Sequence, residues 1–249
     1  MNAKHLAALL AVAGLLGGPA LADWDEGDPY KMHYPQMPDP YGWDIDLTWA
    51  NFAADDWRCT ASGPVDGIHF WYSWERDVVG TIAAIGVTIY SDVPADPNDP
   101  ASYSHPGEPL WSRQFMAGQF TTRLWSDDPT DPQGFYDAGG GWIPNDHGQT
   151  WQCNIGNIEA PFFQQAGTIY WLGLTIWLQD PVGSHIGWKT STDHFMDAAV
   201  FWRDSDGWIE LYPYFDPQYE SLDLAFVITP EPGTLWLLAL GGALLLRRR

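Results

Sequence analysis

The chain has 249 residues, of which 32 are acidic and only 11 are Lys or Arg, so its formal net charge at pH 7 is −21. A charge of this sign repels nucleic acids and anionic lipid surfaces, which excludes both as partners. Sixteen tryptophans are the other unusual feature of the composition, and they supply large rings either for a core or for stacking on sugars.

Residues 1–22 have the three parts of a secretory signal peptide. Lys4 gives a positively charged start, residues 6–16 are apolar, and residues 20–22 form a small-x-small cleavage site. The apolar run is too short and too interrupted by glycine to be a stable membrane span. We therefore expect export, with cleavage after Ala22.

Residues 23–46 are rich in Pro, Asp, Tyr and Gly, which predicts an irregular arm that lies over the domain or is partly disordered. Residues 47–229 then show short runs of alternating apolar and polar residues between turn sequences. The predicted strands are 68–74, 85–90, 110–115, 120–125, 151–158, 168–178, 185–190, 198–202, 208–212 and 222–228. Because no long amphipathic helix separates them, we predict one all-β domain, a single antiparallel two-sheet β-sandwich of jelly-roll type.

Cys59 and Cys153 are the only cysteines of the chain. In an exported protein an even number of cysteines indicates a disulfide, which here would close a loop of roughly 94 residues. A zinc site is the weaker interpretation, because the sequence contains neither Cys-x-x-Cys nor His-x-x-x-His. We predict a disulfide between Cys59 and Cys153.

A tryptophan of a secreted sandwich either fills the core or stacks on the C–H face of a sugar while neighbouring polar side chains bond the hydroxyls. Core packing is the usual role of any single tryptophan. The candidates for glycan stacking are Trp71, Trp74, Trp171, Trp177, Trp188 and Trp202. Trp71 and Trp188 are the two preferred candidates. Trp71 is the better of the two, because it lies out of phase with the apolar residues of its own strand, 68–74.

Loops rich in Asp offer the hard oxygen ligands that calcium prefers. The candidate calcium ligands are Asp127, Asp128 and Asp131. These residues lack the ordered spacing of an EF-hand, and Asx-Pro turns would explain them without an ion. Calcium is therefore the only cofactor that the sequence suggests, with an ion-free turn as the alternative.

Sequence support for catalysis is thin. Titratable residues are adjacent at 55–56, 146–147 and 193–194, and a carboxylate pair is what glycoside hydrolysis needs. Neither Gly-x-Ser-x-Gly nor His-Glu-x-x-His occurs. In so acidic a chain adjacent acids arise by chance, and each pair is interpreted as a turn or a polar contact between strands. We predict that the protein is not an enzyme.

The tail, residues 230–249, has three parts. They are Pro230, Glu231 and Pro232, a short apolar helix over residues 234–246, and the cluster Arg247, Arg248 and Arg249. The apolar part is shorter than the roughly 20 residues that cross a bilayer unaided, and its cationic end is expected to stay cytoplasmic. This tail resembles the PEP-CTERM sorting signal of Gram-negative bacteria. The resemblance implies recognition by an exosortase, cleavage near Pro-Glu-Pro, and release to the cell surface or the exopolysaccharide matrix.

A second resemblance covers nearly all of residues 40–229. It rests on residues 54–60, 63–64, 68–74, 143–147, 187–191 and 193–197. These segments resemble a secreted domain that is common in planctomycete-type bacteria and often carries the same sorting signal. The resemblance implies one domain and an exported setting, and it supplies no catalytic residues.

Together these features predict an exported, non-catalytic protein of the cell surface or extracellular matrix of a Gram-negative-type bacterium. It would be structural or adhesive, with matrix polysaccharide as a candidate ligand, and held in the membrane by its C-terminal helix until an exosortase processes it. One alternative is a carbohydrate-active enzyme, of hydrolase or lyase type, which needs two carboxylates about 5–10 Å apart in a cleft. The other is a plain tail-anchored envelope domain.

Overall fold

The computed structural model describes residues 23–49, 51–99, 101–130, 132–180 and 182–230. The predicted signal peptide and membrane helix lie outside these residues, as do Glu231, Pro232 and the three terminal arginines of the sorting motif. Asp131 of the candidate calcium loop is also outside them, whereas Pro230 directly follows the last strand. Within the described ranges, no helix combines the length and the apolar character needed to span a bilayer.

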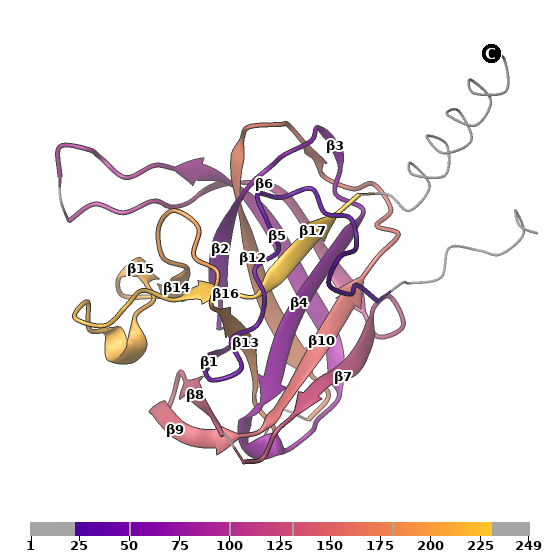
Figure 1. Cartoon of the computed structure of the whole chain (residues 1–249), viewed down its shortest axis with the longest axis vertical. Coiled ribbons are helices and arrows are strands. Elements are labelled where there is room, and N and C mark those ends of the chain that lie inside the picture. Colours follow the sequence, from indigo (N-terminus) through magenta and orange to yellow (C-terminus); the bar gives the residue numbers. More distant parts are fainter. Residues whose placement is uncertain (1–22, 50, 100, 131, 181, 231–249) are drawn as a thin grey trace, which may run out of the picture.

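The described residues form two large β-sheets and one small ribbon (Figure 1). In order along the larger sheet, the strands are β7 (Thr121–Asp127), β10 (Gln149–Ile155), β4 (Gly67–Trp74), β13 (Ile186–Ser191), β1 (Trp43–Asp46), β8 (Gln133–Asp137) and β9 (Gly141–His147), with β16 (Asp223–Leu224) beside β13 and β17 (Phe226–Thr229) beside β4. The smaller sheet runs β15 (Gly207–Glu210), β14 (Val200–Arg203), β2 (Ala53–Arg58), β12 (Ile169–Leu178), β5 (Ile82–Val93) and β6 (His105–Met116). β3 (Gly63–Pro64) and β11 (Phe163–Gln164) form the ribbon, and single 3₁₀ turns occupy Glu75–Asp77 and Pro213–Phe215.

The predicted all-β class is confirmed, and each predicted strand overlaps an observed one. Within the described ranges, the named strands pair antiparallel except for β1 and β8, which run parallel. Sequence alternation missed β1, β2, β8 and β9. These strands carry Asp, Gly and Pro inside their runs, so their side chains look like turn residues. The jelly-roll connectivity stays a prediction.

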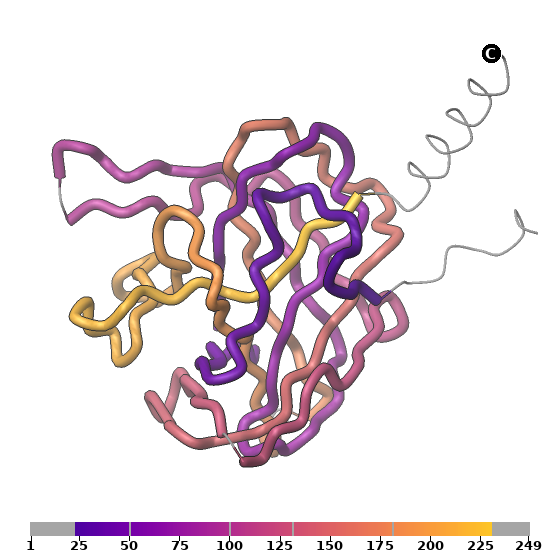
Figure 2. The backbone as a smooth tube through the Cα atoms, viewed as in Figure 1, coloured from indigo at the N-terminus to yellow at the C-terminus, as the bar shows by residue number. Residues whose placement is uncertain are grey.

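The arm expected over residues 23–46 is part of the sheet structure. Its backbone bonds to β17, with the Lys31 amide donating to the Ile228 carbonyl at 2.8 Å and Gln36 N donating to Phe226 O at 3.2 Å. The tube in Figure 2 shows this indigo segment running beside the yellow β17. Its last four residues form β1, which lies between β13 and β8. The arm therefore ends in an interior strand of the larger sheet.

The two cysteines are buried free thiols, so the predicted disulfide is wrong. Cys59 directly follows β2 of the smaller sheet and donates its thiol to the Ala61 carbonyl at 3.3 Å. Cys153 lies in β10 of the larger sheet, opposite Phe70. Burial raises the pKa of both thiols, which keeps them protonated and unreactive. Both pack in the core as small apolar side chains. The prediction failed because an even number of cysteines says nothing about the distance between their sulfur atoms in the fold.

A buried charge cluster joins β1 to β13 and β9. Asp44 on β1 and Lys189 on β13 are register partners with fully buried side chains, and Lys189 Nζ donates to Asp44 Oδ2 at 3.1 Å. His147, at the end of β9, places Nε2 3.0 Å from the same oxygen and Nδ1 3.1 Å from Asp146 Oδ2. Removing one partner of such a buried pair leaves an uncompensated charge, at a cost of about 3–5 kcal/mol.

This cluster makes stability depend on pH. Burial alone would lower the pKa of His147, but the Asp44 and Asp146 carboxylates outweigh it and raise the pKa to about 9 from 6.5. A cationic group with a raised folded-state pKa stabilises fully below its unfolded pKa, and this contribution is lost as pH rises through the folded pKa. We expect the stability difference between wild type and His147→Gln to shrink by up to about 3 kcal/mol between about pH 6 and pH 9.5. Urea unfolding at both pH values measures this, and a pH-independent difference would contradict it.

Candidate functional site

An open groove lined by aromatic rings lies on the face of the smaller sheet that points away from the main core. Its volume is about 440 Å³. The residues that line it are Phe52, Tyr90, Gly107, Trp202, Asp204 and Trp208. The groove therefore lies between the long β5–β6 hairpin, which projects from the sandwich in Figure 1, and the β14–β15 hairpin. A neighbouring hollow of about 460 Å³ shares Trp202 and Trp208.

The β14–β15 hairpin presents the two tryptophans side by side. Trp202 and Trp208 are register partners across the hairpin, with ring centroids 5.3 Å apart at an interplanar angle of 76°. The chain reverses over Asp204 to Gly207, and Gly207 adopts a φ of 77° that disfavours other residues. Pairing across a short hairpin fixes both rings on one face.

Contacts behind the tryptophans hold them in place. Trp208 packs against Phe52 at 5.7 Å and Tyr90 at 6.0 Å between ring centroids. Trp202 keeps 39% of its surface exposed, and its Nε1 donates to Asp204 Oδ1 at 3.2 Å. An exposed ring beside acidic acceptors suits the C–H face and hydroxyls of a sugar.

Trp71 and Trp188 were predicted to stack on glycan from the surface. That prediction is wrong, because neither ring reaches the surface. Both are fully buried. Trp188 belongs to the core between the sheets, where its Nε1 donates to the Ala225 carbonyl at 2.9 Å. Trp71 does point to the opposite face of β4, but Trp24 of the arm and Trp125 cover it, with ring centroids 5.9 and 5.3 Å away. Trp202 was among the wider set of candidates, whereas Trp208 was not. The signal that could have found the groove is a pair of tryptophans flanking an Asp-Gly turn.

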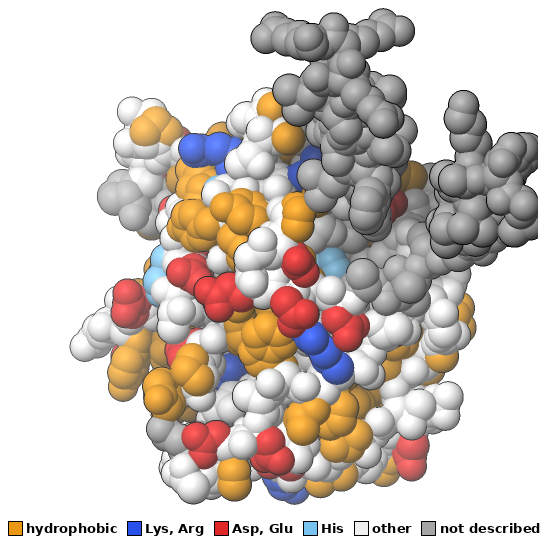
Figure 3. Space-filling model, turned by 45° about the vertical axis from the view of Figure 1, so that its right-hand side comes forward, with side chains coloured by type: hydrophobic (Ala, Val, Ile, Leu, Met, Phe, Trp, Pro, Cys, Tyr) orange, Lys and Arg blue, Asp and Glu red, His pale blue; other side chains and the backbone are white. Residues whose placement is uncertain are grey.

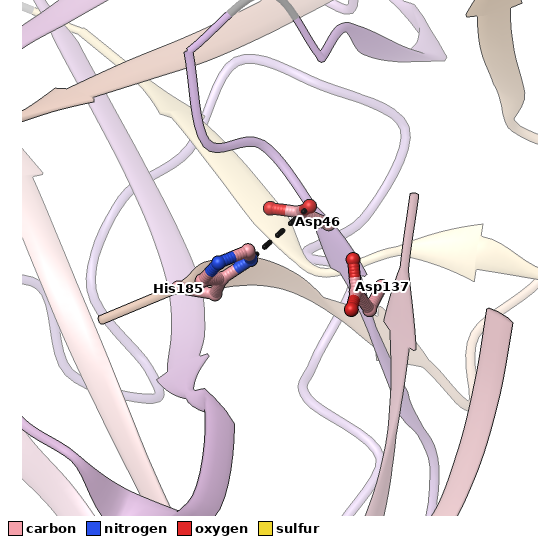
Figure 4. A group of neighbouring side chains, drawn as sticks. All are labelled: Asp46, Asp137 and His185. Atoms are coloured by element: carbon pink, nitrogen blue, oxygen red, sulfur yellow. Dashed lines mark ion pairs between the residues drawn. The ribbon is translucent and has the colours of Figure 1, made fainter. Parts of the chain in front are cut away.

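A second candidate site is a group of two carboxylates and an imidazole in the larger sheet, formed by Asp46, Asp137 and His185 (Figure 4). One ligand atom from each lies within 4.8 Å of the others. The parallel register of β1 and β8 continues from Ile45↔Tyr136, so Asp46 and Asp137 come side by side. His185 directly precedes β13, the other neighbour of β1. We call these three residues the Asp-Asp-His group.

Hydrogen bonds fix the Asp46 carboxylate. Its Oδ1 accepts from Thr48 N at 2.9 Å and its Oδ2 from Asn51 Nδ2 at 2.8 Å. Burial raises the pKa of Asp46, against the opposing effect of the Thr48 bonds and the His185 charge. Carboxylate and imidazole ligands of this kind bind divalent metals. Sequence reasoning missed the group because its members are far apart in the chain.

Three further acids form a buried cluster: Asp55 and Asp56 on β2, and Asp223 on β16. Asp55 Oδ2 accepts hydrogen bonds from Gln36 Nε2 at 2.8 Å and from Leu224 N at 2.6 Å. Asp55 therefore makes a polar contact between separate segments, one of the two interpretations that the sequence analysis gave for the acid pairs. Asp56 is only 1% exposed, and neither of its carboxyl oxygens has a hydrogen-bond partner among the described residues. Burial, followed by the charges of Asp55 and Asp223, raises the pKa of Asp56 to about 10.

The candidate calcium loop forms a turn at the end of β7. Asp128 Oδ1 accepts from Thr130 N at 3.0 Å and from its hydroxyl at 2.6 Å, and these bonds lower the pKa of Asp128. Asp127 and Asp128 are both exposed. The turn accounts for Asp128 without an ion, and calcium binding there stays a prediction.

Residues 32–229 match the family model described as Domain of unknown function (DUF7901), and residues 229–249 match the PEP-CTERM protein-sorting motif. Both resemblances inferred from the sequence are thereby confirmed. The first match takes in all the strands described above, including β1. No curated protein and no solved structure matches the chain significantly.

The Asp56 carboxyl, which has no hydrogen-bond partner among the described residues, leads to a prediction about how stability depends on pH. Asp56 is protonated in the folded chain but ionises in the unfolded chain above its ordinary pKa of about 3.8, so rising pH favours unfolding. Asp56→Asn keeps the shape and removes the ionisation. We expect this variant to melt at a higher temperature than wild type near neutral pH, with the gain shrinking as pH falls towards the ordinary carboxyl pKa.

Thermal unfolding at several pH values measures this, with Asp128→Asn at an exposed turn as the control. A lower melting temperature for Asp56→Asn near neutral pH would show that the ionised carboxylate is needed.

Proposed function

Because the chain belongs to the family described as Domain of unknown function (DUF7901) and carries a PEP-CTERM protein-sorting motif, we propose that it acts as a non-catalytic protein of the cell surface or exopolysaccharide matrix. The motif makes it an exported protein that an exosortase recognises. Within that setting we propose an adhesive role, in which the folded domain binds polysaccharide chains of the matrix.

The observation that carries this proposal is the exposed aromatic groove around Trp202 and Trp208. Two tryptophans at a large angle form a concave apolar corner, and Asp204 supplies an acceptor for hydroxyl groups beside it. Acidic side chains are interspersed with apolar ones over the face shown in Figure 3, where Lys and Arg are few. The net charge of −21 repels acidic polymers, so a neutral polysaccharide is the favoured ligand.

The position of the perturbed carboxyls supports binding rather than catalysis. Glycoside hydrolysis needs two carboxyl groups that face the same bound sugar. Among the described residues, the carboxyls with a raised pKa are Asp46, Asp55, Asp56, Glu210 and Asp223. The four aspartates are buried, and the half-buried Glu210 does not line the groove. A polysaccharide in the groove would meet Asp204 on an exposed turn instead.

Co-sedimentation of the full chain with the producer's neutral matrix polysaccharide tests the proposal. We expect Trp202→Ala and Trp208→Ala each to weaken binding about tenfold, or about 1.4 kcal/mol, because each removes a stacking ring. Trp177→Ala is the matched control, since Trp177 is 36% exposed on the same sheet but does not line the groove.

Equal binding by all three variants and wild type would contradict the proposed groove. Release of new reducing ends from the polysaccharide during the same incubation would favour the carbohydrate-active enzyme instead.

A further inference from the structure

We propose that the Asp-Asp-His group binds one divalent transition-metal ion, of which zinc fits best, and that the ion joins three segments of the larger sheet. This site is distinct from the aromatic groove, which belongs to the smaller sheet, and from the loop of Asp127 and Asp128. Its ligands are Asp46 on β1, Asp137 on β8 and His185 before β13.

The spacing of the three side chains is close to that of a zinc site. Zinc binds carboxylate oxygens at about 2.0–2.2 Å and imidazole nitrogen at about 2.0–2.1 Å, which places neighbouring ligand atoms of a tetrahedral site about 3.4 Å apart. The ligand atoms of the group lie within 4.8 Å of one another, and His185 Nδ1 is 3.7 Å from Asp46 Oδ2. Small rotations of the side chains would therefore complete the geometry. Figure 4 shows the His185 ring directed at Asp46, with the Asp137 carboxylate beside them.

The imidazole supplies an observation independent of the acidic cluster. His185 Nδ1 is shielded from solvent and has no hydrogen-bond partner among the residues that the structure describes, since 3.7 Å from Asp46 is too long for a hydrogen bond. Buried ring nitrogens almost always have a partner. A metal ion between His185 and the two carboxylates would be the partner of this lone pair.

Charge points to the same conclusion. Asp46 and Asp137 lie side by side on neighbouring strands, where like charges repel. Among the described residues, the ion pair of Asp46 is with His185, and no Lys or Arg pairs with either carboxylate. Asp44, two residues away on the same face of β1, has Lys189 for this purpose. A bound cation would supply the missing positive charge.

The donor set selects the metal. Calcium takes six to eight oxygen ligands, whereas a nitrogen donor with two carboxylates suits zinc and its first-row neighbours. Thr48 N and Asn51 Nδ2 hold the Asp46 carboxylate in place, as hydrogen-bond partners of metal ligands usually do. Three protein ligands leave one position of a tetrahedral ion for water or another ligand.

The test is zinc titration of the untagged full chain in detergent, after removal of bound metal with a chelator. Calorimetry gives stoichiometry and affinity, and cobalt substitution reports coordination through its visible absorption. The variants are Asp137→Asn and His185→Gln, whose side chains are partly exposed; circular dichroism of the metal-free variants checks that they fold. His194→Gln is the matched control, because His194 is 37% exposed and also lies near two carboxylates, 3.5 Å from Asp223 and 3.8 Å from Glu220.

We expect one zinc ion per chain for wild type and for His194→Gln, and affinity at least about tenfold weaker in both group variants, because each loses a ligand. Zinc should also raise the melting temperature of wild type and the control but not of the two variants. Absence of stoichiometric zinc binding would overturn the proposal. Retention of full affinity in both variants, or an equal loss in His194→Gln, would overturn it as well.

Discussion

The buried carboxylate of Asp44 ties three strands of the larger sheet together. It lies on the short strand β1 and receives Lys189 from β13 and His147 from β9. A buried charge tolerates only an arrangement in which these partners stay within hydrogen-bond reach. The cluster thus links a strand from the start of the domain to segments more than 100 residues away. Asp46 and the proposed metal site follow on the same face of β1, because alternate residues of a strand share a face.

The sequence was sufficient for the parts of the fold that hydrophobic alternation controls. β4, β5 and β12 have long alternating runs, and the structure has them near their predicted places. It was insufficient for β1 and β8, because a strand whose outward side is covered by other segments can carry buried Asp and Gln there. From sequence alone, such a strand looks like a turn or an irregular arm, because the segments that cover it are not yet known. The same limit hid the Asp-Asp-His group, which depends on the parallel register of these two strands.

Burial also explains why Trp71 and Trp188 were wrongly preferred as the exposed tryptophans. The alternation of apolar and polar residues correctly placed Trp71 on the side of β4 opposite its apolar residues. Trp24 and Trp125 cover that side, so Trp71 is buried there. Trp202 is instead exposed, and Trp208 half-buried, on a hairpin that lies over the outer face of the smaller sheet. The cysteines illustrate the same point, since compartment and count favoured a bond that the two-sheet packing does not form. Export was predictable because its sorting motif is one contiguous segment of the sequence and can be recognised without knowledge of tertiary contacts.

The most direct test of this account is a double-mutant cycle between Asp44→Asn and Lys189→Met, measured by chemical unfolding. If the pair holds β1 in the sheet, each single change should lower the free energy of unfolding by about 3–5 kcal/mol, because it leaves a buried charge without its partner. The double variant should then lose less than the sum of the two, by at least about 1 kcal/mol. Losses that add to within about 0.5 kcal/mol would mean that the two side chains act independently, and would contradict the central role assigned to this pair.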